Sequence, residues 1–245
     1  MNSRSIIHRL RRLAWKVLGS PPSRSLDYVG SNGCIRCAAS FAAWNQVPGD
    51  YLEFGVFRGQ SFSEAYHSIW RNRQKVRQFV ATKEIEKWIQ ERPRFFAFDS
   101  FCGLPGGEAD RHLDYSEGAY ACTETQFTEN IVNNGVDMAD VRIVPGFYDE
   151  TLTADTKEQL SLQRAAIILI DCDLYESTVP VLEFITDLVD QGTILIFDDW
   201  YRFKGDPNKG EQRACNEWLQ KNPHINLVQY WQQGPQSVAF LVNIS

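Results

Sequence analysis

The stretch Ile167–Asp171, with the sequence IILID, decides the fold class. It is a run of apolar residues that ends in a carboxylate. A strand buried on both faces has this continuous apolar pattern, whereas a half-exposed strand alternates apolar and polar residues. Strands buried on both faces are typical of parallel sheets that helices cover. The run therefore predicts an α/β protein.

Other short apolar runs surround this stretch, and helical patterns separate most of them. Two further runs close the chain and are joined by a turn with Gly and Pro, which predicts an antiparallel hairpin. We therefore expect a Rossmann-like sheet of seven strands, mostly parallel, with a C-terminal antiparallel hairpin and helices on both faces. The expected strands are Tyr51–Gly55, Arg94–Asp99, Val141–Val144, Ile167–Asp171, Ile194–Asp198, Leu227–Trp231 and Ser237–Val242.

The chain is expected to divide into an N-terminal helical extension, residues 1–47, and a main domain, residues 48–245. Residues 4–18 are basic and carry apolar side chains on one helical face. We expect a helix that packs on the domain or on another subunit, which would form a homo-oligomer; membrane-surface binding or a transit signal is the alternative. A Gly- and acid-rich stretch at 103–127 predicts a lid over the substrate or a disordered loop, and 69–92 predicts a partly helical insertion.

The composition favours a protein that acts on small molecules. The 245 residues include 25 basic and 31 acidic ones, so the net charge of −6 leaves no basic footprint for nucleic acid. No apolar stretch reaches the roughly 18 residues of a membrane span, and we expect a cytoplasmic protein. Cys34 and Cys37 form a lone Cys-x-x-Cys pair, for which buried thiols are favoured over a redox pair or half a zinc site.

Three expected strands end in aspartate, at Asp99, Asp171 and Asp198, and Asp173 and Asp199 follow closely. Ligands of open α/β sheets bind outside the carboxyl ends of the strands, so we expect these carboxylates at the mouth of one crevice. Helix capping is an alternative for Asp173 or Asp199, but it does not explain all five residues. Carboxylate oxygens are ligands that Mg²⁺ prefers. The sequence therefore predicts an acidic site suited to a metal ion.

The turn after the first strand runs from Glu53 to Ser61 and contains Gly55 and Gly59. The glycines let the backbone approach a ligand closely, and we expect Ser61 to cap the following helix. The spacing differs from the glycine patterns that bind dinucleotides or triphosphates. Together with Asp99, which suits a ribose diol, the turn indicates S-adenosylmethionine as the ligand.

The turn resembles motif I of class I methyltransferases. Four further blocks together resemble the macrolide-sugar O-methyltransferase family, typified by the macrocin and mycinamicin methyltransferases. The blocks are Phe98–Pro105, Val144–Phe147 with Thr151 and Leu152, Ile170–Thr178, and Phe197–Trp200, and the similarity extends over about residues 48–220.

The resemblance implies a role for each matching position in the cofactor site. The turn residues would bind or order the methionine end of S-adenosylmethionine: Glu53, Gly55, Val56, Gly59 and Ser61. The ribose and adenine would meet Asp99, Ser100, Gly146 and Phe147.

The resemblance also implies a metal site and a reaction. Asp171, Asp198 and Asp199 would bind Mg²⁺ or another divalent cation and form the catalytic set. Asp171 would be the base and would also contact the cofactor, and the role of Asp173 stays open. The resulting hypothesis is methyl transfer from S-adenosylmethionine to a hydroxyl of a small molecule, a sugar or another vicinal diol of a natural product. The alternatives are a metal-dependent hydrolase or hydroxylase that uses the same acids, and a cofactor-binding module without catalysis.

Overall fold

The computed structural model describes residues 31–80, 82–106 and 115–245. The predicted basic helix at 4–18 and residues 107–114 of the predicted lid lie outside these described residues. The described chain forms one seven-stranded sheet in the order β3-β2-β1-β4-β5-β7-β6. Its strands are β1 (Asp50–Phe54), β2 (Phe95–Asp99), β3 (Val141–Pro145), β4 (Ala165–Ile170), β5 (Ile194–Phe197), β6 (Ile225–Gln233) and β7 (Ser237–Ile244).

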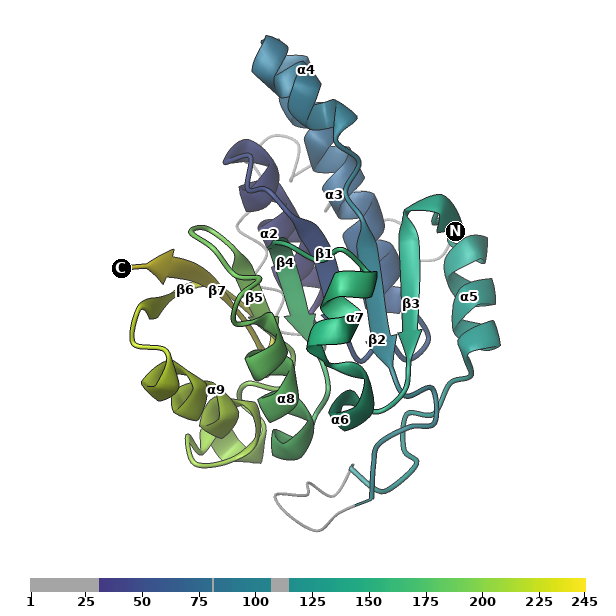
Figure 1. The fold of residues 1–245 in the computed structure, drawn as a ribbon, viewed down its shortest axis with the longest axis vertical. Helices are drawn as coiled ribbons and strands as arrows, with labels where there is room; N and C mark the ends of the chain where they lie inside the picture. The colour runs from purple at the N-terminus through teal and green to yellow at the C-terminus, as the bar shows by residue number, and fades with distance from the viewer. Residues whose placement is uncertain (1–30, 81, 107–114) are drawn as a thin grey trace, which may run out of the picture.

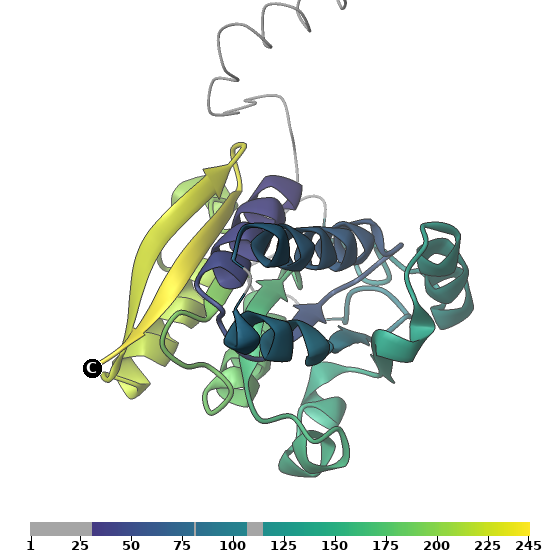
Figure 2. The same cartoon turned by 90° about the horizontal axis from the view of Figure 1, so that it is seen from above.

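The direction of the strands confirms the predicted architecture. Strands β1 to β5 are parallel, β7 runs antiparallel to β5, and β6 runs antiparallel to β7. The β6–β7 hairpin forms one edge of the molecule and stands out in the view from above (Figure 2). All residues of β4 are buried, as the continuous apolar run in its sequence predicts.

Helices cover both faces of the sheet. Neighbouring residues of each strand point to opposite faces, so each strand contributes to two cores. Tyr51 and Ile167 contribute to one core, and Leu52 and Ile168 contribute to the other. The first core is covered by α2 (Asn32–Trp44), α3 (Gln60–Phe79) and α5 (Glu124–Asn133). The second face carries α6 (Tyr148–Thr151), α7 (Ala154–Gln159), α8 (Tyr175–Ile185) and α9 (Gly210–Lys221), which lie in front of the sheet in Figure 1.

Helix α2 belongs to the main core, although it falls within the predicted extension. Cys34, Ile35 and Ala38 of this helix are fully buried among residues of the sheet. Burial raises the pKa of the Cys34 thiol to about 12, as expected for a thiol that packs as a small apolar group.

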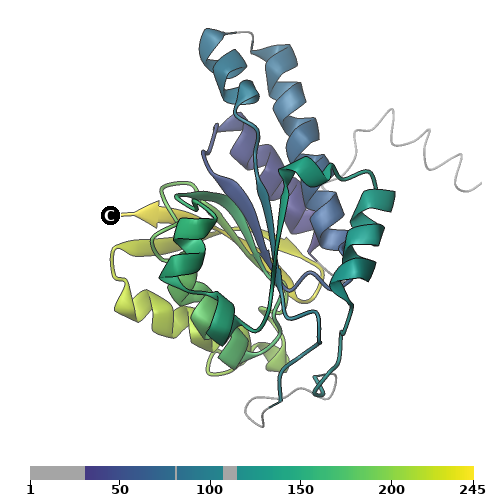
Figure 3. The same ribbon diagram turned by 45° about the vertical axis from the view of Figure 1, so that its right-hand side comes forward.

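The insertion predicted at 69–92 consists of the second half of α3 and of α4 (Lys83–Gln90). A helix of 20 residues is about 30 Å long, so α3 extends well beyond the five-residue strand that precedes it. Buried Arg73 ties α4 to α3, because its guanidinium lies over the ring of Trp88 and donates to the carbonyls of Trp88 and Glu91. The resulting arm projects from the molecule, away from the carboxyl ends of the strands (Figures 1 and 3).

The structure adds elements that the sequence does not predict. Helices α6 and α7 have only four and six residues, and two short 3-10 helices lie at Met138–Asp140 and Phe203–Gly205. None of the described helices combines the length and apolar character needed to cross a membrane.

Candidate active site

The register of the parallel strands brings the predicted site residues into one row. Phe54 of β1 pairs with Phe98 of β2 and with Ile170 of β4. Ile170 also pairs with Phe197 of β5. The residues that come next therefore lie side by side at the carboxyl edge of the sheet: Gly55, Asp99, Asp171 and Asp198.

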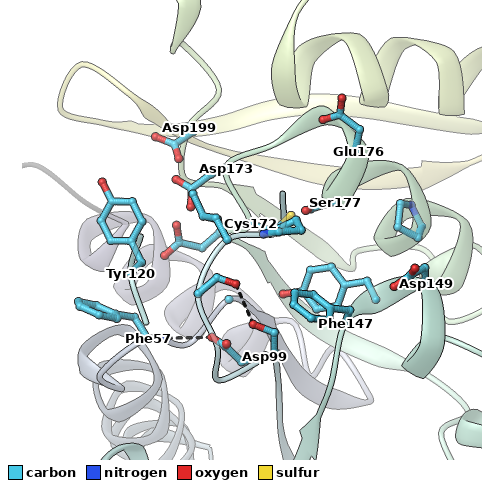
Figure 4. A pocket seen from close by; sticks show the side chains of 18 of the residues that line it. Phe57, Asp99, Tyr120, Phe147, Asp149, Cys172, Asp173, Glu176, Ser177 and Asp199 are labelled. Carbon is cyan, nitrogen blue, oxygen red and sulfur yellow. Dashed lines mark hydrogen bonds between the residues drawn. The ribbon is translucent and has the colours of Figure 1, made fainter. Parts of the chain in front are cut away.

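A cavity of about 790 Å³ lies over this edge (Figure 4). Its walls come from the glycine turn, the carboxyl ends of β2 to β5, residues 103–106 and the starts of α6 and α8. The volume is typical of a small-molecule site. Eight of the predicted site residues line it: Gly55, Asp99, Ser100, Gly146, Phe147, Asp171, Asp198 and Asp199.

The turn after β1 requires glycine at both predicted positions. Gly55 has a φ of 88°, and a Cβ there would lie 1.8 Å from the carbonyl oxygen of Asp171. Gly59 has a φ of 78°, and a Cβ would lie 2.5 Å from Cγ2 of Ile131 on α5. Side chains are strained at such φ values and cannot fit in these spaces. The two glycines thus let the turn pack against both the end of β4 and α5.

The prediction that Ser61 caps the next helix is wrong. Helix α3 begins at Gln60 with Gly59 as its N-cap, so Ser61 already lies inside the first turn. Its hydroxyl instead donates to Oε1 of Glu53 at 2.5 Å. The hydroxyl of Tyr51 donates to Oε2 of the same carboxyl, also at 2.5 Å. Glu53 is fully buried, and burial raises its pKa to about 8.

The Asp99 carboxylate holds the turn in place. It accepts hydrogen bonds from the backbone N–H groups of Val56 at 2.8 Å, Phe57 at 3.2 Å and Phe101 at 2.7 Å. Val56 contributes through this N–H, since its side chain is buried in the core. A carboxylate can accept about four hydrogen bonds, so Asp99 keeps acceptor capacity on the side that faces the cavity.

The residues expected at the adenine lie on the next wall of the cavity. Gly146 donates its N–H to the Asp99 carbonyl at 2.9 Å, and its φ of 133° turns the chain away from β3. Phe147 follows it and is partly exposed within the cavity. The Ser100 hydroxyl donates to the carbonyl of Gly103 at 2.9 Å and so fixes the start of the 103–106 segment.

Three carboxylates gather on the opposite side of the cavity. One oxygen each of Asp171, Asp173 and Asp199 lies within 4.8 Å of the others. Asp173 has a φ of 62°, which is uncommon for a residue with a side chain. Oδ1 of Asp198 instead accepts a hydrogen bond from Ser237 on β7 at 2.7 Å. The structure thus groups Asp171 and Asp199 of the predicted metal set with Asp173.

Burial makes ionisation of this group costly. It raises the pKa values of Asp171 and Asp173 well above the usual range, and repulsion between the carboxylates raises them further. Burial also raises the pKa of Asp198, to about 6. Buried like charges need protons or a cation to become stable. Because the ligands are hard oxygens, this donor set fits a divalent ion such as Mg²⁺.

Residues that the sequence analysis missed surround Asp199. Nε of Arg202 lies 2.9 Å from Oδ1 of Asp199, and Oε2 of Glu211 accepts from the Asp199 backbone N–H at 3.0 Å. The ring of Tyr115 is buried below the Arg202 guanidinium, and burial and the negative charge of Asp199 raise the pKa of its phenol. Arg202 follows Asp199 by only three residues, whereas tertiary packing brings Glu211 and Tyr115 to Asp199 and Arg202.

The sheet order, the glycine turn and the row of strand-end acids define the class I methyltransferase fold. Within this class, the macrocin O-methyltransferase (TylF) family model matches residues 33–218. The chain therefore belongs to this family, which confirms the resemblance found in the sequence.

Two curated relatives come from Streptomyces. The 8-demethyl-8-(2,3-dimethoxy-alpha-L-rhamnosyl)-tetracenomycin-C 4'-O-methyltransferase of Streptomyces olivaceus is 32% identical over 161 residues, which are 63% of this chain and 54% of the relative. The demethyldecarbamoylnovobiocin O-methyltransferase of Streptomyces niveus is 28% identical over 174 residues, 68% of this chain and 58% of the relative. The match thus spans just over half the length of both relatives.

The solved structure of the O-methyltransferase NovP is similar with a TM-score of 0.64 and 23% sequence identity. The similarity covers 86% of this chain and 78% of the NovP chain. At this identity the likeness shows the shared fold.

Proposed function

We propose that the protein transfers a methyl group from S-adenosylmethionine to a hydroxyl of a small molecule, a sugar or another vicinal diol of a natural product. One observation carries this proposal: the glycine turn, Asp99 and the partly buried acidic cluster face one cavity. Membership of the macrocin O-methyltransferase family supports transfer to oxygen. The name of one relative describes methylation of a compound that carries a rhamnosyl group, which supports a sugar acceptor.

S-adenosylmethionine would supply an electrophilic methyl group on a positively charged sulfur. Gly55 lines the cavity where the methionine end would bind, and Gly59, Val56, Ser61 and Glu53 keep the turn in shape. The free acceptor capacity of Asp99 suits a ribose hydroxyl. Ser100, Gly146 and Phe147 form the wall proposed for adenine. An acidic cavity also suits a cationic cofactor.

We further propose that a divalent cation, Mg²⁺ by preference, binds at the acidic cluster. Asp171 and Asp199 would hold it together with Asp173 or Asp198. The support is the geometry: one carboxylate oxygen each of Asp171, Asp173 and Asp199 lies within 4.8 Å of the others, at a wall of the cavity that also carries Asp198. Such an ion lowers the pKa of a hydroxyl that coordinates it. Mg²⁺ keeps several coordination positions for water or substrate. Two neighbouring hydroxyls of a sugar are suited to occupy two of these positions.

Asp171 is the proposed base. It follows β4 directly, lines the cavity and lies beside Gly55, where the methionine end of the cofactor is expected. It faces the cavity in which an acceptor would bind, and a base has to lie within hydrogen-bond reach of the proton that it removes. Asp171 would remove the proton of the acceptor hydroxyl as the methyl group is transferred.

Calorimetric titration of the full chain with S-adenosylmethionine, with and without Mg²⁺, tests the cofactor assignment. Incubation with glycosides that carry vicinal diols, with and without a chelator, tests the reaction by mass spectrometry. We expect cofactor binding and a methylated product that chelation abolishes. Failure to bind S-adenosylmethionine under both conditions would contradict the proposal, and cleavage of the acceptor without the cofactor would favour a hydrolase. Binding without any transfer would favour a non-catalytic module.

A further inference from the structure

Asp199 is held at both its side chain and its backbone. Arg202 pairs with its carboxylate at 2.9 Å, and the two side chains are 23% and 5% exposed. Glu211, in the first turn of α9, accepts a hydrogen bond from the backbone N–H of Asp199 and is itself almost fully buried. Neither partner belongs to β5, the strand that ends just before Asp198. Asp199 is thus fixed by residues that follow it in the chain.

Arg202 is fixed in turn by the segment that enters β7. With its amide oxygen toward Arg202, Gln236 accepts from the guanidinium nitrogens at 2.6 Å, 2.9 Å and 3.1 Å. The guanidinium also lies 5.6 Å from the centre of the Tyr115 ring. A planar guanidinium held in this way can orient a carboxylate with little further loss of freedom. Asp199 therefore has a rigid partner.

The charge of Arg202 is unusual at this place. It is the only cationic side chain among the described residues that line the cavity, whereas eight of those residues are acidic. Four neighbouring carboxyl groups, those of Asp171, Asp173, Asp198 and Asp199, share this one guanidinium. The group therefore keeps an excess of acidic side chains, which suits a bound cation.

We propose that Arg202 is a positioning residue, which fixes the Asp199 carboxylate so that it can share a divalent cation with Asp171 and Asp173. The inference rests on the proposed cation site and adds the residue that orders one of its ligands. Groups that orient a metal ligand typically change metal affinity about 10-fold to 100-fold when they are removed.

Orientation and electrostatic repulsion predict opposite results for the loss of Arg202. A nearby positive charge repels a cation, so repulsion alone predicts tighter cation binding once the guanidinium is removed. A positioning role predicts weaker binding, because Asp199 then has to be ordered when the cation binds. The sign of the change in affinity therefore separates the two effects.

The experiment measures Mn²⁺ affinity on the full chain, freed of metal, by following the EPR signal of free Mn²⁺. The variants are Arg202→Met, Arg202→Lys and Gln236→Leu. Arg213→Met is the control, because Arg213 forms a partly exposed pair with Glu217 on α9 outside the cavity. We expect about 10-fold weaker binding for both Arg202 variants, a smaller loss for Gln236→Leu and no change for Arg213→Met. Circular dichroism checks folding, and Gln236→Leu decides the matter if Arg202→Met does not fold.

The outcomes separate this inference from the proposed function. If the wild type binds Mn²⁺ and Arg202→Met binds it equally or more tightly, the positioning role is overturned and the cation site stands. If Arg202→Lys binds Mn²⁺ with wild-type affinity, the positioning role is also overturned, because a positive charge without the planar guanidinium would then be enough for Mn²⁺ binding. A wild type that binds no Mn²⁺ overturns the cation site and the inference together. The affinity for S-adenosylmethionine, measured in parallel, should stay unchanged in Arg202→Met.

Discussion

The carboxyl groups on the two sides of the cavity differ in what surrounds them. On the turn side, Asp99 accepts three backbone N–H groups and Glu53 accepts two hydroxyls. On the acidic side, Asp171 and Asp173 lie close together with raised pKa values. The turn side therefore needs only the proton that Glu53 keeps below about pH 8, since hydrogen bonds within the fold satisfy the rest, whereas the three clustered carboxyl groups of the acidic side need several protons or a cation.

This difference suggests how the work of the site is divided. Hydrogen bonds within the turn fix its shape before any ligand arrives, and preorganised sites lose less freedom on binding. The acidic side keeps its charges close together and exposed to the cavity, which is the arrangement expected where charge changes during a reaction. Variants on the two sides should therefore separate cofactor binding from catalysis.

The largest effect is expected for Asp171→Asn. The substitution keeps the size of the side chain but removes both the proposed base and a cation ligand. We expect the rate of methyl transfer to fall by about 10² to 10⁴, a far larger loss than the loss of affinity for S-adenosylmethionine, which Asp171 is also expected to contact. Steady-state kinetics and calorimetry measure the two quantities.

Asp149→Asn is the matched control for Asp171→Asn, since it removes a negative charge from an exposed residue of the same cavity. We expect it to retain the wild-type rate. Equal losses in both variants would mean that the charge of the whole cavity matters rather than a base at Asp171.

On the turn side, Gly55→Ala should disrupt the fold of the site itself. Its Cβ would meet the Asp171 carbonyl oxygen at 1.8 Å. We expect a loss of about 3 kcal/mol or more in the free energy of unfolding, together with weaker S-adenosylmethionine binding. Gly192→Ala is the control, because its φ of 87° is nearly the same but the added Cβ would make only ordinary contact, 3.5 Å from Val47. If both variants lose the same stability, the backbone conformation and not the close approach explains the requirement.

Glu53 gives the turn side a pH dependence. Burial raises its pKa from 4.5 to about 8, so the folded protein holds this proton more strongly than the unfolded chain. The stability that Glu53 contributes is thus fully present below about pH 4.5 and is lost as the pH rises toward 8, with a slope of up to about 1.4 kcal/mol per pH unit. Glu53→Gln should remove this slope. Urea unfolding of both proteins at pH 6 and pH 8 tests this, and parallel pH profiles would refute it.

The sheet and the strand-end row were predictable from the sequence, because continuous apolar runs mark buried strands wherever they occur. Asp99, Asp171 and Asp198 end such runs, so register alone places them at one edge. The place of Asp173 depends on a left-handed backbone conformation, and that of Arg202 on contacts with distant segments. A four-residue helix such as α6 is also too short to show a helical period.

The smallest effects are expected for two serines, one on each side, that each donate a hydrogen bond to a carboxyl group. Ser61 donates to Glu53 at 2.5 Å, and Ser237 donates to Asp198 at 2.7 Å. Replacing either by Ala should lower the free energy of unfolding by about 1 kcal/mol.

The functional consequences of the two serine variants should differ, and this is the finest test of the division between the sides. Ser61→Ala loosens the turn, so we expect several-fold weaker S-adenosylmethionine binding and unchanged Mn²⁺ affinity. Ser237→Ala loosens Asp198, so the same two titrations should give the reverse result. If both variants weakened the binding of both ligands equally, the two sides would form a single cooperative unit. The loss of one hydrogen bond would then be transmitted across the strand ends from Glu53 to Asp198.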